Sequence, residues 1–443
     1  MDVNMKQPIN TGGLRLSKKD THLLIGTLTL FALILRLMVA YTSVHYYDLS
    51  FYVDWSTGVT RDFYGAYNNI ESLDYPPLFL FPLFLTGKLL SVDVFTIFEP
   101  YRMLALKGWQ LLFDTACVPL FYTVLRRWGV LASIAGAALW AVNPTALLNS
   151  AYWGQTDAIM IFLVVAAFAL LEQRRAVWSG VVMTLACLMK FQSLYFAPVY
   201  ALVLLTAYPP RKSLQTIAAG LGTAAAVFLP FMARSGFALP VRIYFGGFEK
   251  YAGTSLNAFN LYGALGLNYQ SIDTELIGGV TAGLISVIAS VLACALLVYL
   301  FFTATARSLW LLGFVFMQTV FLFSARMHER YQIPVLAMAL AACFCHKSRK
   351  LFTGFAALTV MTFLNHFFVI EEMFTADKSL AWIAHYDLIV IILSWVNLLL
   401  YIWTLAISIR IFYKHGKKPF LQTLRAGLPY FGSSRPLPGQ GSP

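Results

Sequence analysis

Long apolar runs separated by short polar segments dominate the chain from residue 22 to residue 410. A helix needs about 20 apolar residues to cross the hydrocarbon core of a bilayer, so the pattern predicts about 12 membrane-spanning helices. The predicted spans are residues 22–42, 104–125, 130–148, 156–172, 176–190, 193–208, 214–232, 276–302, 308–324, 331–346, 351–370 and 383–410. The expected fold is an all-α polytopic membrane protein.

Basic residues recur after every second predicted span. They are Lys18, Lys19, Arg126, Arg127, Arg174, Arg175, Arg211, Lys212, Arg307, Lys347, Arg349, Lys350, Lys414, Lys417 and Lys418. Short basic loops stay on the cytoplasmic side, so both termini are expected there. The predicted organisation is a cytoplasmic segment 1–21, a membrane domain 22–413 and a cytoplasmic tail 414–443 that ends disordered.

A further apolar run covers residues 76–90. If it crossed the membrane completely, every later basic cluster would move to the outside, against the positive-inside rule. We therefore predict a re-entrant or interfacial helix within a long first external loop, residues 43–103. A second large external loop is expected at residues 233–275.

Composition agrees with a membrane protein and narrows its partners. The chain has 443 residues, of which 59% are hydrophobic and 12% are charged, too apolar for a soluble domain of this size. The net charge of +12 is explained by the basic loops, so no nucleic-acid partner is expected. The five cysteines lie in or beside apolar segments, without the paired spacing of a zinc or disulfide site.

The segment SARMHERYQIP, residues 324–334, places Arg326, His328, Glu329 and Arg330 between two apolar runs. Both arginines fall on the predicted external side, against the bias of nearly all the others. Ionisable groups near the hydrocarbon are costly and usually mark a substrate path or a buried pair. The alternative is that Glu329 pairs with one arginine while the other extends to the membrane surface.

Other polar segments are predicted on the same side, and each has an ordinary structural interpretation. Asp157, at the end of NSAYWGQTD, could cap a helix. Asn257 and Asn260 in TSLNAFNLYG could be loop amides that satisfy backbone groups. Lys190 could extend to the membrane surface. His45 is expected to be a solvated loop residue. Trp55, Trp153 and Tyr331 are expected to belong to the aromatic belt at the membrane interface.

Acidic residues early in the first loop and cations in a later loop suit glycosyl transfer from a lipid phosphate. The acceptor hydroxyl must lose a proton as it attacks the sugar, which a positioned carboxylate can accept. The leaving phosphate gains negative charge, which Arg and Lys stabilise. Asp48 is a carboxylate of this loop, although it could also be a capping or solvated group.

Six segments in order resemble bacterial glycosyltransferases of the GT-C superfamily. They are DLSFYVDW at 48–55, DYPPLFLFPL at 74–83, NPTALLNSAYWGQTD at 143–157, LMKFQSLYFAP at 188–198, SLNAFNLYGALG at 255–266 and SARMHERYQIP at 324–334. More narrowly, they are similar to the integral-membrane mannosyltransferases related to the second mannosyltransferase of GPI-anchor synthesis. The similarity runs from about residue 20 to about residue 370.

The resemblance implies a GT-C fold, a polyprenyl-phosphate-linked sugar donor, transfer of a hexose, with mannose as the family-level expectation, with inversion, and an active site on the outer face of the plasma membrane. It matches Asp48 to the general base, and Arg326, His328 and Arg330, with Lys190, to the donor phosphate. The positions matched to sugar or acceptor binding are Asp74, Tyr75, Gln155, Asp157, Asn257 and Asn260. The acceptor stays unassigned.

Two positions depart from the family pattern: Phe191 stands where relatives commonly have Pro, and Leu78 where many have Gly. The first puts the role of Lys190 in doubt. The mechanism requires no cofactor, although Asp48 with Asp54 or His45 could hold a divalent metal. Transport of a lipid-linked sugar is the alternative function, but no convincing internal repeat supports it. A third possible function is that of a non-catalytic assembly partner that has the same fold.

Overall fold

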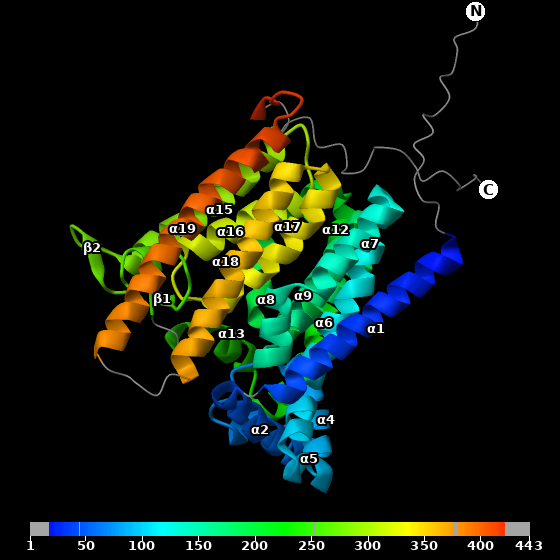
Figure 1. The fold of residues 1–443 in the computed structure, drawn as a ribbon, viewed down its shortest axis with the longest axis vertical. Coiled ribbons are helices and arrows are strands. Elements are labelled where there is room, and N and C mark those ends of the chain that lie inside the picture. The colour runs from blue at the N-terminus through cyan, green and yellow to red at the C-terminus, as the bar shows by residue number, and fades with distance from the viewer. Residues whose placement is uncertain (1–16, 44, 251–252, 375–379, 421–443) are drawn as a thin grey trace, which may run out of the picture.

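The computed structural model describes residues 17–43, 45–250, 253–374 and 380–420. Long helices form a bundle, and a group of shorter helices lies beyond one end of it (Figure 1). Up to residue 207 the helices are α1 (Lys18–Thr42), α2 (Tyr46–Arg61), α3 (Ala66–Asn69), η1 (Pro77–Phe79), α4 (Leu80–Leu90), α5 (Asp93–Ile97), α6 (Glu99–Leu125), η2 (Arg126–Trp128), α7 (Val130–Ala141), α8 (Pro144–Leu147), η3 (Leu148–Trp153), α9 (Asp157–Glu172), α10 (Ala176–Met189), η4 (Phe191–Phe196) and α11 (Ala197–Ala207).

The rest of the described chain adds helices and two very small sheets. Its elements are α12 (Pro210–Ser235), α13 (Leu239–Lys250), β1 (Ser255–Leu256), α14 (Leu261–Ala264), β2 (Glu275–Ile277), β3 (Val280–Thr281), α15 (Ala282–Thr303), α16 (Leu309–Phe323), β4 (Met327–His328), η5 (Glu329–Gln332), α17 (Ile333–His346), α18 (Arg349–Phe374) and α19 (Leu380–Phe412). Strand β1 pairs in parallel with β4, and β2 pairs antiparallel with β3. The predicted all-α fold is therefore confirmed apart from these short strands.

Among the described residues, five helices are long and apolar enough to cross a membrane: α1, α12, α15, α18 and α19. A sixth span is possible if α7 and the following segment Pro144–Trp153, bent by 41°, count as one. Each of the predicted spans contains helix, but several of these helices are short, so the count of about 12 stays a prediction. The apolar helices fit a multi-pass membrane protein.

Exposure separates the helices that face lipid from those enclosed by protein. Leu214 and Leu221 on α12, and Leu399 on α19, are each more than 60% exposed, which suits contact with lipid chains. Every residue from Leu309 to Leu322 in α16 and from Ile333 to Cys343 in α17 is buried. Helices α16 and α17 pack on each other and form the apolar centre of the bundle.

Several predicted boundaries were wrong. The span predicted at 130–148 breaks at Asn143, whose side chain caps α8 before Pro144. The span predicted from residue 276 begins as the hairpin β2–β3, and its helix starts at Ala282. The two long loops predicted to be external are largely structured, since helices α2 to α5 occupy the first, and α13, β1 and α14 the second.

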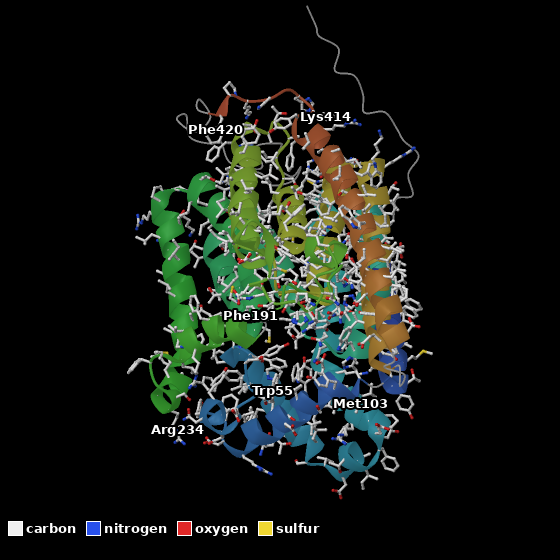
Figure 2. The ribbon with its side chains drawn as sticks, turned by 90° about the vertical axis from the view of Figure 1, so that its left-hand side faces the viewer. Trp55, Met103, Phe191, Arg234, Lys414 and Phe420 are labelled. Carbon is white, nitrogen blue, oxygen red and sulfur yellow. The ribbon has the colours of Figure 1, made fainter. Side chains whose placement is uncertain are left out.

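The helices of the first loop have their own apolar core. Trp55, Val59 and Leu83 pack there with Phe231 of α12 and Ile243 of α13. We call this part of the molecule the loop end; Trp55 and Met103 lie there in Figure 2, and Lys414 and Phe420 lie at the opposite, basic end. The apolar run 76–90 is helical over η1 and α4 and packs against α2, so it belongs to the loop end, while its depth in the membrane stays a prediction.

Candidate active site

Asp48 lies in the first turn of α2, where the helix dipole favours a negative charge. His45 precedes the helix as its N-cap, and its Nδ1 accepts a bond from the Asp48 backbone N–H at 3.4 Å. The Asp48 side chain is 25% exposed. This placement keeps the carboxylate reachable from solvent while its helix is anchored in the apolar core of the loop end.

Two donors from the 149–157 motif hold the Asp48 carboxylate. Trp153 Nε1 donates to Oδ2 at 2.6 Å, and Gln155 Nε2 donates to the same oxygen at 2.5 Å. Within the described part of the chain, Oδ1 accepts no hydrogen bond. A carboxylate with one oxygen fixed and the other open has the geometry that a general base requires.

Trp153 is an unexpected centre of this arrangement. Its side chain stacks on the His45 ring with centroids 4.6 Å apart, and the Arg330 guanidinium lies 6.0 Å from the Trp153 ring centroid. The indole is therefore in contact with both the candidate base and a candidate phosphate ligand. The predicted interfacial belt was wrong for Trp55, Trp153 and Tyr331, since all three are at least 94% buried. His45 is buried too, not solvated, and burial lowers its pKa.

Lys190 is buried in an ion pair. Its Nζ lies 2.8 Å from Asp157 Oδ1, and both side chains are at most 2% exposed. Asn149 also donates to Asp157, at 3.3 Å. The interpretation of Lys190 as a residue that reaches the membrane surface was therefore wrong. Asp157 is the first residue of α9, but its carboxylate contacts Lys190 and Asn149, and Thr156 is the N-cap.

The SARMHERYQ segment is held at the site by backbone pairing across the chain. Ser255 aligns with Met327, and Leu256 with His328, in the β1–β4 ladder. The Arg326 N–H also donates to the Thr254 carbonyl at 3.0 Å, with Arg326 in the left-handed region at φ 63°. This pairing unites two of the motifs that the sequence had placed on one side of the membrane.

Glu329 balances the charge of this segment. It pairs with Arg330 at 2.8 Å and lies 3.8 Å from His328, so the alternative in which Glu329 pairs with one arginine is realised for Arg330. Burial opposes ionisation of Glu329, but Arg330 and then His328 outweigh it, and the pKa of Glu329 is lowered. Burial and then the charge of Arg330 lower the pKa of His328, although Glu329 opposes this shift.

A cavity of about 30 Å³ joins several predicted site residues. Its lining residues are Asp74, Tyr75, Pro76, Lys190, Phe191, Gln192, Arg330 and Tyr331. Gln192 donates to the Tyr331 hydroxyl at 2.6 Å, and the Tyr75 and Thr156 hydroxyls lie 3.2 Å apart. The cavity has room for only one or two water molecules, so a hexosyl phosphate requires its walls to move apart.

Asn257 and Asn260 have structural partners. The Asn257 side chain donates to the Tyr269 hydroxyl and accepts from the Asn268 amide, both at 2.8 Å. Asn260 caps α14 by accepting from the Gly263 N–H. These contacts match the loop-amide interpretation, and sugar binding by either residue stays a prediction. Asn260 Nδ2 is buried and has no hydrogen-bond partner among the described residues, so this amide keeps one donor that a ligand could use.

The loop that contains Asn257 and Asn260 is also held by two buried amide side chains from distant helices, which the sequence analysis did not identify. Asn365 of α18 donates to the Asn257 carbonyl at 2.6 Å and accepts from the Phe259 N–H at 3.0 Å. Asn397 of α19 donates to the Phe259 carbonyl at 2.7 Å. An amide within an apolar span was a usable signal, because a polar group in that environment needs a partner.

The described residues include no group of three or more His, Cys, Asp or Glu side chains able to hold a metal ion. His45 Nδ1 lies 3.9 Å from Asp48 Oδ2, while Asp54 lines a separate surface groove. Of the two pairs that the sequence suggested for a divalent cation, the structure brings His45 close to Asp48, and metal binding there stays untested.

The Lys190–Asp157 pair gives a first prediction. Lys190→Met leaves Asp157 buried without its cation, so we expect about 3–5 kcal/mol lower stability. Thermal unfolding in detergent measures this, with the exposed Lys350→Met as control. Lys190→Met/Asp157→Leu should recover most of the loss. A single variant that melts like the wild type would show that the pair contributes little to stability.

These features define a class: a helical, multi-pass membrane protein with a charged site beneath a structured loop end. Comparison with known proteins then supports a particular activity. Residues 74–266 match the family model "Glycosyltransferase family 87". The match supports a membrane glycosyltransferase, and it covers the motifs at 74–83, 143–157, 188–198 and 255–266.

The matched range stops short of both ends of the candidate site. Asp48 precedes it, and the segment 324–334 follows it. The narrower similarity to the second GPI-anchor mannosyltransferase is not confirmed by this match. No curated protein matches the chain.

Proposed function

We propose that this protein transfers a hexosyl group, with mannose as the first choice, from a polyprenyl-phosphate donor to an acceptor hydroxyl. The observation that carries the proposal is the placement of Asp48 and Arg330 around Trp153. A fixed carboxylate at the edge of the indole and a largely enclosed guanidinium over its face suit a reaction in which a proton is removed beside a leaving phosphate.

The proposed chemistry is a single inverting displacement. The acceptor oxygen attacks the anomeric carbon while its proton passes to Asp48 Oδ1. The bond between the anomeric carbon and the phosphate oxygen breaks, and the phosphate keeps the electron pair. Arg330 stabilises the charge that accumulates there, and Arg326 and His328 are proposed as further ligands of the phosphate. This assignment needs no metal.

Lys190 is assigned a more limited role than the sequence suggested. It lines the cavity, but its ammonium is already bound to Asp157 at 2.8 Å. A donor phosphate that contacted Lys190 would have to share it with this carboxylate. In the proposed mechanism the pair Lys190–Asp157 shapes the cavity floor, and Arg330 is the main phosphate ligand.

The proposed acceptor path is a groove of about 910 Å³ on the surface of the loop end. It is lined by Phe51, Asp54, Thr57, Gly58, Arg61, Asn69, Ile70, Glu71, Ser72 and Asp74. Asp74 also lines the small cavity, so it lies where the groove and the cavity meet. Carboxylates and amides beside an aromatic ring suit the hydroxyl groups and faces of a sugar chain.

Asp54→Asn/Glu71→Gln tests this path. Hydrogen bonds to charged groups contribute about 1.5–3 kcal/mol, so acceptor KM should rise about 10-fold or more while donor KM stays unchanged. Glu275→Gln, an exposed acid on β2, is the control. A rise in donor KM alone would contradict acceptor binding in the groove.

We propose that the site faces outward from the plasma membrane and that both termini are cytoplasmic. In support, a predicted cytoplasmic loop contacts the ends of two predicted spans: Arg127 of the loop pairs with Glu172, and the Trp310 indole donates to the same glutamate. Lys414 lies at that end, opposite Trp55 (Figure 2). Basic loops on one side of the bundle are typical of the cytoplasmic face.

The function is tested with radiolabelled polyprenyl-phosphate mannose and polyprenyl-phosphate glucose in membranes that contain the protein, with host lipid and glycan extracts as acceptors. Label in a new product with wild type, and not with Asp48→Asn, would support transfer and identify the sugar. Unchanged donor that crosses sealed vesicles, with no effect of Asp48→Asn, would replace transfer by transport.

A further inference from the structure

Helix α6 carries a buried cation that the proposed chemistry does not use. Lys107 is 0% exposed. Across the residues that the structure describes, no carboxylate pairs with it; the nearby acid of the same helix, Asp114, is paired with Arg36 at 2.8 Å. Burial of an ammonium without a counterion is costly, so its partners must be unusually favourable.

Those partners are oxygens at the ends of two helical segments. Lys107 Nζ lies 2.7 Å from the Ser43 carbonyl and 3.0 Å from its hydroxyl. It lies 3.0 Å from the Ala151 carbonyl and 2.8 Å from the Tyr152 carbonyl. Ser43 is the C-cap of α1, and Ala151 and Tyr152 lie in the last turn of η3. Helix C-termini carry partial negative charge, which stabilises a cation there.

The two segments that Lys107 joins lead directly to the candidate base. The chain after Ser43 continues into α2 and Asp48, and the chain after Tyr152 continues into Trp153 and Gln155. Asp48 accepts its two hydrogen bonds from these last residues. The Lys107 ammonium therefore joins the chain just before α2, which carries Asp48, to the chain just before Trp153 and Gln155, which bind Asp48.

Close packing at Gly154 also fixes the position of the Trp153–Gln155 turn against α6. Gly154 has φ 84°, and a Cβ there would lie 3.0 Å from Lys107 Cγ and 3.1 Å from Leu49 Cδ2. One turn further along α6, Gln110 donates to the Gly154 carbonyl at 2.9 Å. Helix α6 thus holds the Trp153–Gln155 turn by two side chains and packs it against the residue that follows Asp48.

We infer that Lys107 is a positioning residue that sets the orientation of Trp153 and Gln155 toward the Asp48 carboxylate. It contacts neither the cavity nor the groove, so it acts through these residues. The inference deepens the proposed function and rests on Asp48 as its base. Its structural part, the dependence of the Trp153 environment on Lys107, holds independently of any transfer assay.

The test is the ¹⁹F spectrum of full-length protein labelled with 5-fluorotryptophan, with the Trp153 resonance assigned by Trp153→Phe. Lys107→Met should shift or broaden this resonance, as Asp48→Asn should. Glu172→Gln removes a charge at the basic end and should leave it in place. If Lys107→Met does not fold, Lys107→Gln, which keeps a donor without the charge, should move the resonance in the same sense.

Kinetics separates positioning from a general loss of structure. A displaced reacting group can cost roughly 10²-fold in rate, so kcat for transfer should fall by about that factor while KM for polyprenyl-phosphate mannose stays within twofold. A Trp153 resonance at its wild-type position in the folded Lys107 variant overturns the inference whatever the transfer assay shows. A wild-type protein inactive with both donors would instead reject the proposed function and leave the spectral result standing.

Discussion

Asp48→Asn is expected to abolish sugar transfer while leaving the fold intact. General base catalysis typically contributes 10²–10⁴-fold, so kcat should fall by roughly that factor. The asparagine has nearly the same shape, and its carbonyl oxygen can still accept the bonds from Trp153 and Gln155. The measurement is initial transfer rate in membranes with matched protein levels.

The control for this variant is Asp93→Asn, an exposed acid at the start of α5 in the same loop end. It should transfer at the wild-type rate, because its side chain lies outside the cavity and the groove. Retained activity in Asp48→Asn would remove Asp48 as the base. The proposal would then need another carboxylate, of which Asp74 lines the cavity.

Arg330→Met has the second large expected effect. Loss of a buried donor to developing charge typically costs 10²–10³-fold, and we expect roughly that fall in kcat/KM for the donor. Arg330→Lys keeps the charge but not the planar fork, so it should recover only part of the activity. Transfer rates at varied donor concentration measure both, and the exposed Arg242→Met on α13 is the control.

A stability effect must be separated from this catalytic one. Arg330→Met also leaves the buried Glu329 with His328 as its remaining close partner, which destabilises the site. Arg330→Met/Glu329→Gln removes that unpaired charge and should restore much of the melting temperature. If the double variant also regained transfer, Arg330 would be a structural partner of Glu329 and not the phosphate ligand.

The predicted spans and loops show most clearly how much of the fold could be predicted from the sequence. Apolar length predicted helices at every proposed span, because backbone groups in hydrocarbon must be satisfied within the helix. It failed where local chemistry overrides hydropathy: Asn143 and Pro144 begin a new helix inside the span predicted at 130–148. Helix α2 was not predicted, because its carboxylates interrupt the apolar pattern and the segment was assigned to a polar loop.

Candidate site residues were predicted unevenly. Arg330 was identified because charges near an apolar run are costly, and Asp48, Asp157 and Lys190 because they lie in polar segments predicted on the same side and match the family motifs. Their partners were not, since Lys190 and Asp157 are 33 positions apart and Asp48 and Trp153 are 105 apart. Trp153 was assigned to an interfacial belt because the sequence shows an aromatic residue at a span end but not which side of the helix is enclosed.

By itself, the sequence determined that the protein is helical, where most helices lie and which polar residues are unusual. These properties follow from hydropathy and local backbone chemistry, which act over a few turns. Only the tertiary structure decided that β1 pairs with β4, that Lys107 joins two helix ends, and that Trp153 contacts both Asp48 and Arg330. Such contacts depend on the relative placement of whole helices, which many distributed packing interactions determine together.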